Sequence, residues 1–210
     1  MRVISGIFRS RLLAAPRGMA TRPTSDRLRE TLFNVLGARV AGSRFADLYA
    51  GSGAVGIEAL SRGAAQVWFA EKAPAAVAAI RQNLRVLGIT RGFAVEPRGV
   101  AAWLGGVEQG SPEAARADLV FLDPPWEAAG EYASTLGALG GPRGADVLSA
   151  GALVVAEHAA RSPLAAVYGG LRHTRTLKQG DAALSFYTAA AGFCAEAGEE
   201  AGPAGDAPPV

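Results

Sequence analysis

A short apolar segment, residues 45–50, runs directly into a glycine-rich turn, residues 51–56, which opens a helical stretch. The turn has the spacing G-x-G-x-x-G. Glycines in such a turn let the backbone come close to a ligand, and the first N–H groups of the following helix face that ligand. A strand, a glycine turn and a helix begin a β-α-β unit, so this segment predicts a parallel sheet covered by helices.

Strand-like and helix-like segments continue to alternate along the chain. We expect strands at 45–50, 67–71, 92–96, 118–122 and 152–157, helices at 54–63, 74–88 and 99–105, and a final antiparallel pair at 171–177 and 183–189. This order predicts an α/β fold, a Rossmann-like sheet with helices on both faces. A small N-terminal β-hairpin is expected over residues 2–14, and Thr24 or Ser25 can cap a helix that follows it.

Acidic residues stand beside the glycine turn. Asp47 precedes the turn, and Glu71 ends the next strand roughly 20 residues after Gly51, where an acid accepts hydrogen bonds from ribose hydroxyls. A nicotinamide dinucleotide and S-adenosylmethionine both fit this pattern. Asp47 favours S-adenosylmethionine, because a carboxylate pairs with its ammonium group but repels a pyrophosphate. The expected cofactor contacts are Asp47, Ala50, Gly51, Ser52, Gly53 and Glu71.

A second motif, Asp123-Pro124-Pro125-Trp126, follows the apolar run 119–122. Proline supplies no N–H donor, so the carbonyl groups there can accept hydrogen bonds from a substrate amine, and a base can lie on the indole. Hydride transfer has no use for such a slot, which favours methyl transfer over a dinucleotide-dependent oxidoreductase. The alternative is an ordinary turn that ends a strand. We take these four residues as the candidate catalytic group.

The predicted strand ends bring these motifs together. Gly51, Glu71, Asp123 and His158 each fall at the end of a predicted strand. Ligands of parallel α/β sheets bind at the carboxyl ends of the strands. We therefore expect one shared active-site edge.

Basic residues are concentrated at the start of the chain. Residues 1–44 contain nine arginines and two acidic residues, whereas the formal net charge of the whole chain is +2. A basic segment beside a nearly neutral body favours a phosphate-rich partner, because neutralising phosphates releases counterions. A solvated arginine surface is the alternative. The candidate nucleic-acid contacts are Arg9, Arg11, Arg17, Arg22 and Arg27.

Other features narrow the class of protein. The single cysteine, Cys194, and two histidines, His158 and His173, predict neither a disulfide framework nor a metal site. No apolar run approaches the roughly 20 residues of a membrane span, and the start lacks the apolar core of a secretory signal. We expect a cytoplasmic monomer with one domain, residues 1–191, made of a basic part (1–44) and a catalytic core (45–191). Residues 192–210 are expected to be a disordered tail.

Several segments together resemble the bacterial 16S rRNA guanine-N2 methyltransferase family, of the RsmD type. The resemblance covers about residues 1–190 and rests on Arg2-Val3-Ile4-Ser5-Gly6, Arg22-Pro23-Thr24-Ser25-Asp26-Arg27, the segments 47–53 and 123–126, Glu157-His158 and Leu184-Ser185-Phe186-Tyr187. It implies transfer of a methyl group from S-adenosylmethionine to the N2 amine of guanine 966 in 16S rRNA, in the assembling 30S subunit. It also adds Thr24 to the expected cofactor contacts.

The sequence departs from this family pattern at one place. Relatives usually carry an acid after the third strand to meet the adenine of the cofactor, and this chain has Gly99-Val100 there. Glu96, a backbone carbonyl or the shape of the pocket is expected to take over that contact.

Besides the dinucleotide-dependent oxidoreductase, which the Asp-Pro-Pro-Trp motif disfavours, two other functions stay open. Adenine-N6 methylation of DNA or RNA is the nearer one, because the Asp-Pro-Pro-aromatic motif serves either amine. A non-catalytic RNA-binding module is the other, against which the intact glycine turn, Glu71 and Asp123 speak.

Overall fold

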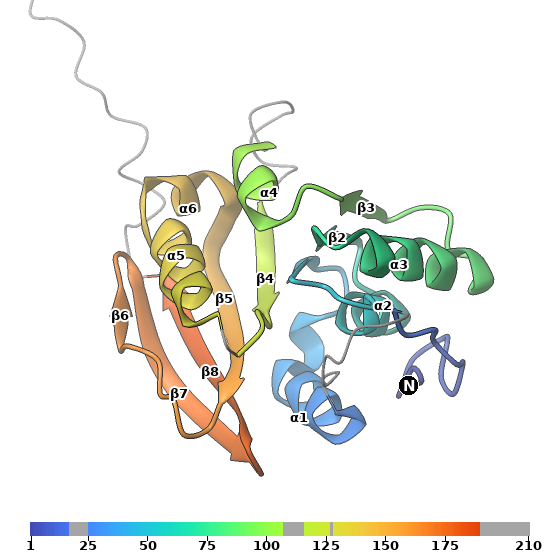
Figure 1. Ribbon diagram of the computed structural model, residues 1–210, viewed down its shortest axis with the longest axis horizontal. Helices are drawn as coiled ribbons and strands as arrows, with labels where there is room; N and C mark the ends of the chain where they lie inside the picture. The colour runs from blue at the N-terminus through green and yellow to red at the C-terminus, as the bar shows by residue number, and fades with distance from the viewer. Residues whose placement is uncertain (17–24, 107–115, 127, 190–210) are drawn as a thin grey trace, which may run out of the picture.

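An eight-stranded mixed sheet lies at the centre of the computed structural model, which describes residues 1–16, 25–106, 116–126 and 128–189 (Figure 1). The strand order is β3-β2-β1-β4-β5-β8-β7-β6. The strands are β1 Arg44–Leu48, β2 Gln66–Ala70, β3 Phe93–Glu96, β4 Ala117–Leu122, β5 Leu148–Ala159, β6 Val167–Tyr168, β7 Leu171–Gln179 and β8 Ala182–Ala189. The predicted tail, 192–210, lies outside the described residues.

Strands β1 to β5 pair in parallel, so their carboxyl ends meet at one edge of the sheet. The remaining strands pair antiparallel: β5 with β8, β8 with β7, and β7 with β6. The predicted antiparallel final pair is therefore confirmed. The two-residue strand β6 was not expected.

Helices cover both faces of the sheet, as predicted (Figure 1). One face carries α1 Asp26–Leu36, α2 Ala54–Ser61 and α3 Pro74–Val86, which pack on Phe45, Phe69 and Phe121. The other carries α4 Val100–Gly106, α5 Ala129–Gly140 and α6 Pro142–Val147, which pack on Leu48, Val120 and Leu122. A 3₁₀ turn, Gly37–Arg39, follows α1. Helices α5 and α6 were not predicted. No described helix combines the length and the apolarity needed to cross a bilayer.

The glycine turn places α2 against the sheet. Gly53 precedes the helix with a φ of 75°, a backbone conformation that favours glycine. A Cβ atom on Gly56 would lie 2.3 Å from Cε1 of Phe69 on β2, so only glycine allows this close packing. The Gly56 N–H donates to Oδ2 of Asp47 at 2.8 Å. The start of α2 is thus fixed beside the carboxyl end of β1.

The expected hairpin over residues 2–14 is present as a short one. An antiparallel bridge joins Arg2 and Leu12, and the Val3 N–H donates to the Arg11 carbonyl at 2.9 Å. Buried Glu58 on α2 accepts the N–H groups of Ile4 and Ser5 at 2.7 and 2.9 Å. The hairpin is therefore tied to α2 through this carboxylate.

The predicted cap of α1 is present. The Oγ of Ser25 accepts a hydrogen bond from the Leu28 N–H at 3.1 Å, so Ser25 is the N-cap residue of α1. Thr24 lies outside the described residues.

Candidate functional site

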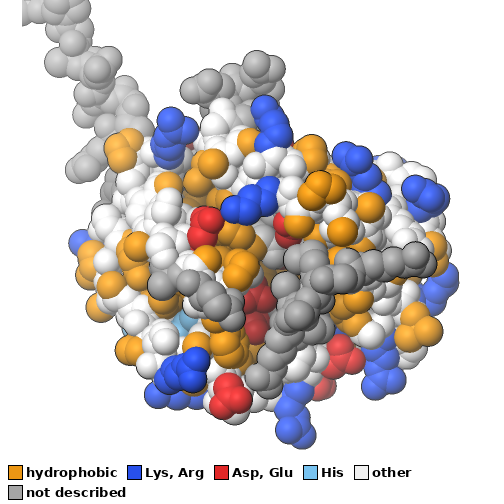
Figure 2. Space-filling model, viewed as in Figure 1, with side chains coloured by type: hydrophobic (Ala, Val, Ile, Leu, Met, Phe, Trp, Pro, Cys, Tyr) orange, Lys and Arg blue, Asp and Glu red, His pale blue; other side chains and the backbone are white. Residues whose placement is uncertain are grey.

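A cavity of about 710 Å³ opens at the carboxyl edge of the parallel strands. Asp47, Glu71 and Asp123, which come from or directly follow three different strands, line it. Figure 2 shows acidic and hydrophobic side chains gathered in a hollow at the centre of one face, with lysine and arginine side chains around the outline. The predicted shared edge is therefore present for these residues.

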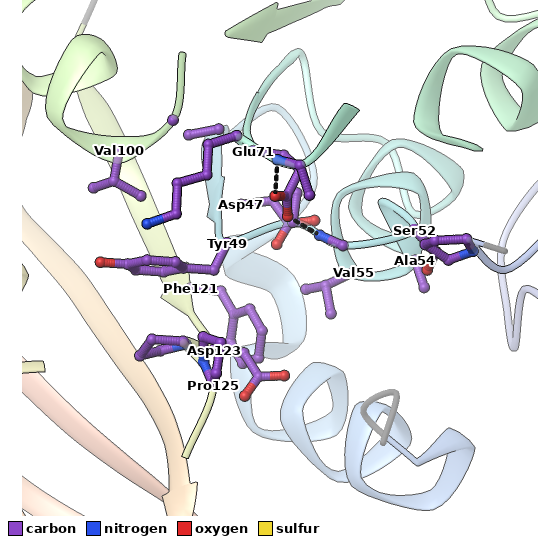
Figure 3. Close-up of a pocket in the computed structure, with 18 of the residues that line it drawn as sticks. Asp47, Tyr49, Ser52, Ala54, Val55, Glu71, Val100, Phe121, Asp123 and Pro125 are labelled. Carbon is purple, nitrogen blue, oxygen red and sulfur yellow. Dashed lines mark hydrogen bonds between the residues drawn. The ribbon is translucent and has the colours of Figure 1, made fainter. Parts of the chain in front are cut away.

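Glu71 closes the glycine side of the cavity. Its Oε2 accepts the Gly51 N–H at 2.9 Å and its Oε1 accepts the Ala73 N–H at 2.8 Å (Figure 3). A carboxylate has about four acceptor sites, so these two bonds leave room for ligand hydroxyls. The backbone thus holds the Glu71 carboxylate in place and leaves part of its acceptor capacity available to a ligand.

The remaining residues of the predicted glycine site divide into two groups. Ala50, Gly51 and Ser52 line the cavity. Gly53 is absent from the described lining; its N–H donates to the Ala50 carbonyl at 2.7 Å, and a Cβ atom there would lie 3.1 Å from Cγ1 of Ile80. The geometry therefore gives Gly53 a structural part, which is to let α2 begin beneath α3.

Asp47 is almost completely buried at the floor of the cavity. Burial raises the pKa of this carboxyl to about 8, against the opposing effect of the Gly56 N–H; nearby Glu71 raises it further and Arg29 lowers it. A carboxyl in this state is largely neutral at neutral pH and ionises when a cation is bound beside it. Asp47 is therefore suited to receive a positively charged group.

The Asp-Pro-Pro-Trp segment forms the opposite side of the cavity, and all four residues line it. In Figure 3, Glu71 and Asp47 lie on one side and Asp123 and Pro125 on the other, with the rings of Tyr49 and Phe121 between them. The Asp123 N–H donates to the Leu48 carbonyl at 3.3 Å, which ties the start of the segment to β1.

A tyrosine on α5 holds the Pro124 carbonyl. The hydroxyl of Tyr132 is 3.2 Å from the carbonyl oxygen of Pro124 and 3.0 Å from that of Glu157. The Pro124 carbonyl thus has one partner already, and its second lone pair stays available for a substrate N–H. Trp126 is half-buried and belongs to neither hydrophobic core cluster. This position suits a platform for a ligand better than a core residue.

Several lining residues were missed from the sequence, namely Met1, Ala15, Pro16, Tyr49, Lys72, Arg98, Phe121 and Glu131. Tyr49 connects the two sides: its hydroxyl donates to Oε2 of Glu131 at 2.8 Å and lies 2.6 Å from Oγ1 of Thr135. Burial raises the pKa of Tyr49 to about 12. Tyr49 and Lys72 adjoin predicted residues in the chain, and that adjacency was the available signal. Glu131 lies on α5, which was itself not predicted.

Gly99 and Val100 line the cavity where the family pattern has an acid. Glu96 does not line it, because its carboxylate binds Arg98, with Nε at 2.8 Å and Nη2 at 2.9 Å. Arg98 lowers the pKa of Glu96. The backbone and the apolar side chain of Val100 therefore shape this corner.

Three of the five predicted nucleic-acid contacts, Arg9, Arg11 and Arg27, are exposed, and Arg17 and Arg22 lie outside the described residues. Arg11 donates to the Val86 carbonyl, at the last residue of α3, whereas Ala73 at the start of α3 lines the cavity. Asn83, about one helical turn before Val86, donates to the carbonyl of the lining residue Ser52 at 3.0 Å, so this end of α3 also adjoins the cavity. The contact of Arg11 with a nucleic acid stays a prediction.

Two other arginines of the basic segment are used inside the fold. Arg29 is fully buried near Glu58, and Arg44 pairs with Asp118 at 3.0 Å. The surface of this segment is therefore less positive than its composition indicates. Among the described residues, no group of three or more histidine, cysteine, aspartate or glutamate side chains could hold a metal ion.

The comparisons with known proteins agree with this geometry. The sequence model of the family described as "Conserved hypothetical protein 95" matches residues 1–188. The chain belongs to this family. A curated relative, "Ribosomal RNA small subunit methyltransferase D" of Escherichia coli (strain K12), is 36% identical over 126 residues, which are 60% of this chain and 60% of that protein. The family resemblance expected from the sequence is confirmed. The matched stretch spans less than two thirds of that relative's length.

Solved structures show that the family fold is that of methyltransferases. A protein from Escherichia coli has a TM-score of 0.74 and 30% identity, over 91% of this chain and 98% of that one. An RNA methyltransferase from Salinibacter ruber in complex with S-adenosyl-L-homocysteine has a TM-score of 0.54 and 18% identity, over 80% of this chain and 94% of that one. The chain has the predicted Rossmann-like methyltransferase sheet.

Proposed function

We propose that this protein is an S-adenosylmethionine-dependent methyltransferase that modifies the N2 amine of a guanine in 16S rRNA, guanine 966. One observation carries the proposal: a single cavity has a buried carboxyl and a ribose-type acid on one side and the Asp-Pro-Pro-Trp segment on the other. Its volume of about 710 Å³ lies in the range of small-molecule sites. The name of the E. coli relative supports ribosomal RNA as the substrate.

The residues present fit this cofactor. Asp47 would hold its ammonium group, Glu71 its ribose hydroxyls, and Ala50, Gly51 and Ser52 would approach it through the backbone. Thr24, Arg17 and Arg22, which lie outside the described residues, remain proposed contacts. S-adenosylmethionine supplies the sulfonium methyl group.

The Asp-Pro-Pro-Trp segment would prepare the amine. The lone pair of a guanine N2 is delocalised into the ring, so the group is a weak nucleophile. Asp123 and the Pro124 carbonyl would accept hydrogen bonds from the two N–H groups of this amine. These hydrogen bonds would localise the lone pair of the amine on its nitrogen, while Trp126 supports the guanine ring. With S-adenosylmethionine bound, its sulfonium methyl group would be transferred to this nitrogen, and Asp123 would accept the proton that the amine loses. Alignment of this kind can save roughly 7–11 kcal/mol of barrier.

Transfer of a labelled methyl group tests the proposal. Purified protein is incubated with methyl-labelled S-adenosylmethionine and with naked 16S rRNA or 30S subunits that lack the modification, and the methylated nucleotide is mapped. Label on a guanine N2 is expected. Label on an adenine would support the adenine-N6 alternative, and no label in either RNA would contradict methyl transfer to rRNA.

The Asp123→Ala variant is the matched control for chemistry. It should keep cofactor affinity, because the proposed cofactor contacts lie on the other side of the cavity, and should lose about 10²–10⁴ in rate. Turnover like that of the wild type would remove Asp123 from the mechanism.

A further inference from the structure

A second, smaller cavity of about 250 Å³ adjoins the Asp-Pro-Pro-Trp segment. Trp126 is the one residue that the described linings of both cavities share. The end of β5, the loop after it, β6 and part of α5 form the rest of its wall, with His158, Leu164 and Tyr168 among the lining residues. Trp126 therefore borders two neighbouring cavities.

The chemistry of the second cavity suits a flat, uncharged ring. None of its described lining residues is lysine, arginine, aspartate or glutamate, and four are aromatic, namely Trp126, Tyr132, His158 and Tyr168. Stacking on aromatic side chains binds nucleobases of any sequence, because every base has a π-face. A phosphate would not be held inside such a wall. Exposed Arg161, next to the lining residue Ser162, could meet one at the rim.

The wall is held in place by hydrogen bonds. The Nδ1 of His158 lies 3.0 Å from the carbonyl oxygens of both Ala159 and Ser162, so this nitrogen carries the proton and Nε2 accepts from Oγ of Ser185 at 2.8 Å. Burial lowers the pKa of His158, which agrees with a neutral ring. The Ala165 N–H donates to the Tyr168 hydroxyl at 3.2 Å. The cavity is thus formed before any ligand arrives.

The proposed function places the target guanine in the first cavity. Asp123 and Pro124, the groups proposed to bind its amine, line the first cavity and are absent from the described lining of the second. A base joined to the target through the RNA backbone would lie close by, with the indole between the two. Turning the target out of its stack leaves its neighbour without a partner, and an aromatic ring offsets that cost.

We propose that the second cavity binds the base of a nucleotide adjacent to the target guanine, with Trp126 inserted between the two bases. This inference rests on the proposed function and adds to it a substrate contact outside the catalytic motif. It requires that RNA binding depends on a base at one of the two positions beside the target.

Filling the cavity tests the inference. Ala133 on α5 is exposed and lines the cavity, whereas its exposed neighbour Ser134 does not, so Ala133→Phe and Ser134→Phe form a matched pair. The loop offers a second pair, Ala165→Leu in the lining and Ala166→Leu outside it. Thermal unfolding and cofactor affinity establish that each variant is folded.

The variants are assayed on an rRNA fragment that the wild type methylates, intact or with an abasic site on either side of the target. For the wild type, one abasic site should raise KM by roughly ten- to a hundredfold, with kcat nearly unchanged. The two cavity-filling variants should show a similar rise on intact RNA and no further rise on that abasic RNA. Their partners Ser134→Phe and Ala166→Leu should behave as the wild type.

Three results separate the possible failures. A wild type that methylates the fragment but is indifferent to both abasic sites overturns this inference and leaves the proposed function standing. Folded cavity-filling variants also overturn it if their KM on intact RNA equals that of the wild type. The same holds if the abasic site raises their KM as much as it raises that of the wild type. A wild type that methylates no rRNA contradicts the proposed function itself.

Discussion

The buried carboxyl of Asp47 makes the ligand-free protein sensitive to pH. Its pKa is raised from 3.8 to about 8, so the folded chain keeps a proton that the unfolded chain loses above about pH 4. The stabilisation by the neutral buried form is complete below the unfolded pKa and is lost as the pH rises through the folded value. Wild-type stability should therefore decline between pH 4 and 8 because of this group.

The Asp47→Asn variant isolates that effect. Asparagine has no proton to lose and keeps an oxygen for the Gly56 N–H. The Tm of the variant should therefore exceed that of the wild type by a margin that grows as the pH rises from 5 to 8. Thermal unfolding of both proteins without cofactor, over that range, measures the difference. A difference in Tm between the two proteins that is the same at every pH would mean that Asp47 is already ionised in the folded protein.

Trp126 can be separated from an ordinary core residue. Because the side chain is half-buried and borders two cavities, Trp126→Ala should lose about 1–3 kcal/mol of RNA binding, and Trp126→Tyr should keep most activity. A core tryptophan would instead cost about 3–5 kcal/mol of folding stability. Unfolding and RNA binding are measured on the same alanine variant. A large drop in Tm with intact RNA affinity would contradict the platform role.

At the scale of elements, Glu58 on α2 anchors the N-terminal segment. It is fully buried and accepts from the N–H groups of Ile4 and Ser5 and from Nε of Arg62 at 2.8 Å. Met1 and Pro16 of the same segment line the main cavity. The stability of α2 and the shape of the cavity are therefore connected through one carboxylate.

Replacing Glu58 should affect both properties. Removing one partner of a buried ion pair costs about 3–5 kcal/mol, so Glu58→Ala should lower Tm strongly and weaken cofactor binding in the fraction that remains folded. Arg2→Ala is the control, because the Arg2–Asp26 pair is 3.9 Å long and largely exposed, and such pairs contribute about 0–1 kcal/mol. Similar stability losses in the two variants, followed by denaturant unfolding, would argue against the anchor.

The strands that sequence patterns predicted well are those that are apolar and buried along most of their length. The apolar runs that became β1, β2 and β4 end in or just before Asp47, Glu71 and Asp123, so the central sheet and its acidic edge could be predicted together. The segment 129–147 could not, because it is rich in glycine, which disfavours helices. Burial of Tyr132, Leu136 and Leu139 along one side of α5 overrides that propensity.

Missing α5 also hid part of the site. The contact between Tyr49 and Glu131 joins residues 82 positions apart, which no local pattern reveals. The N-terminal hairpin could be predicted, but its anchor could not: Glu58, which accepts two of its N–H groups, lies 53 and 54 positions away. Long-range side-chain partners fix both places.

Over the whole molecule, two groups of exposed cations lie on different elements. Arg9 and Arg11 belong to the N-terminal hairpin, and Arg11 donates to the Val86 carbonyl at the end of α3. The second group, Arg27, Arg161 and Lys178, belongs to segments at the carboxyl edge. Strand β7 runs in the same direction as β5, so Lys178 near its end lies at that edge. Arg27 lies one turn before Thr31 on α1, and Oγ1 of Thr31 is 3.0 Å from Oε1 of Gln179, the last residue of β7. The second group borders the region where the RNA strand would enter.

The salt dependence of RNA binding should distinguish these groups. Each lost phosphate contact lowers the slope of log K against log salt by about 0.7–0.9. Glutamine at Arg27, Arg161 and Lys178 together should flatten the slope, and cofactor binding should not change. Glutamine at Arg9 and Arg11 gives the comparison set. A slope that responds only to Arg9 and Arg11 would place the RNA on the N-terminal hairpin.

During synthesis the ribosome delivers β8 after every other described strand, yet β8 lies in the interior of the sheet, between β5 and β7. Chains grow at about 5–20 residues per second, so β5 waits for a second or more with one edge unpaired after it has emerged. Bare strand edges pair readily with other chains. A nascent chain that stalls before Ala182 would leave β6 and β7 detached from the rest of the sheet and β5 open to such pairing, so incomplete chains of this protein should aggregate more readily than finished ones.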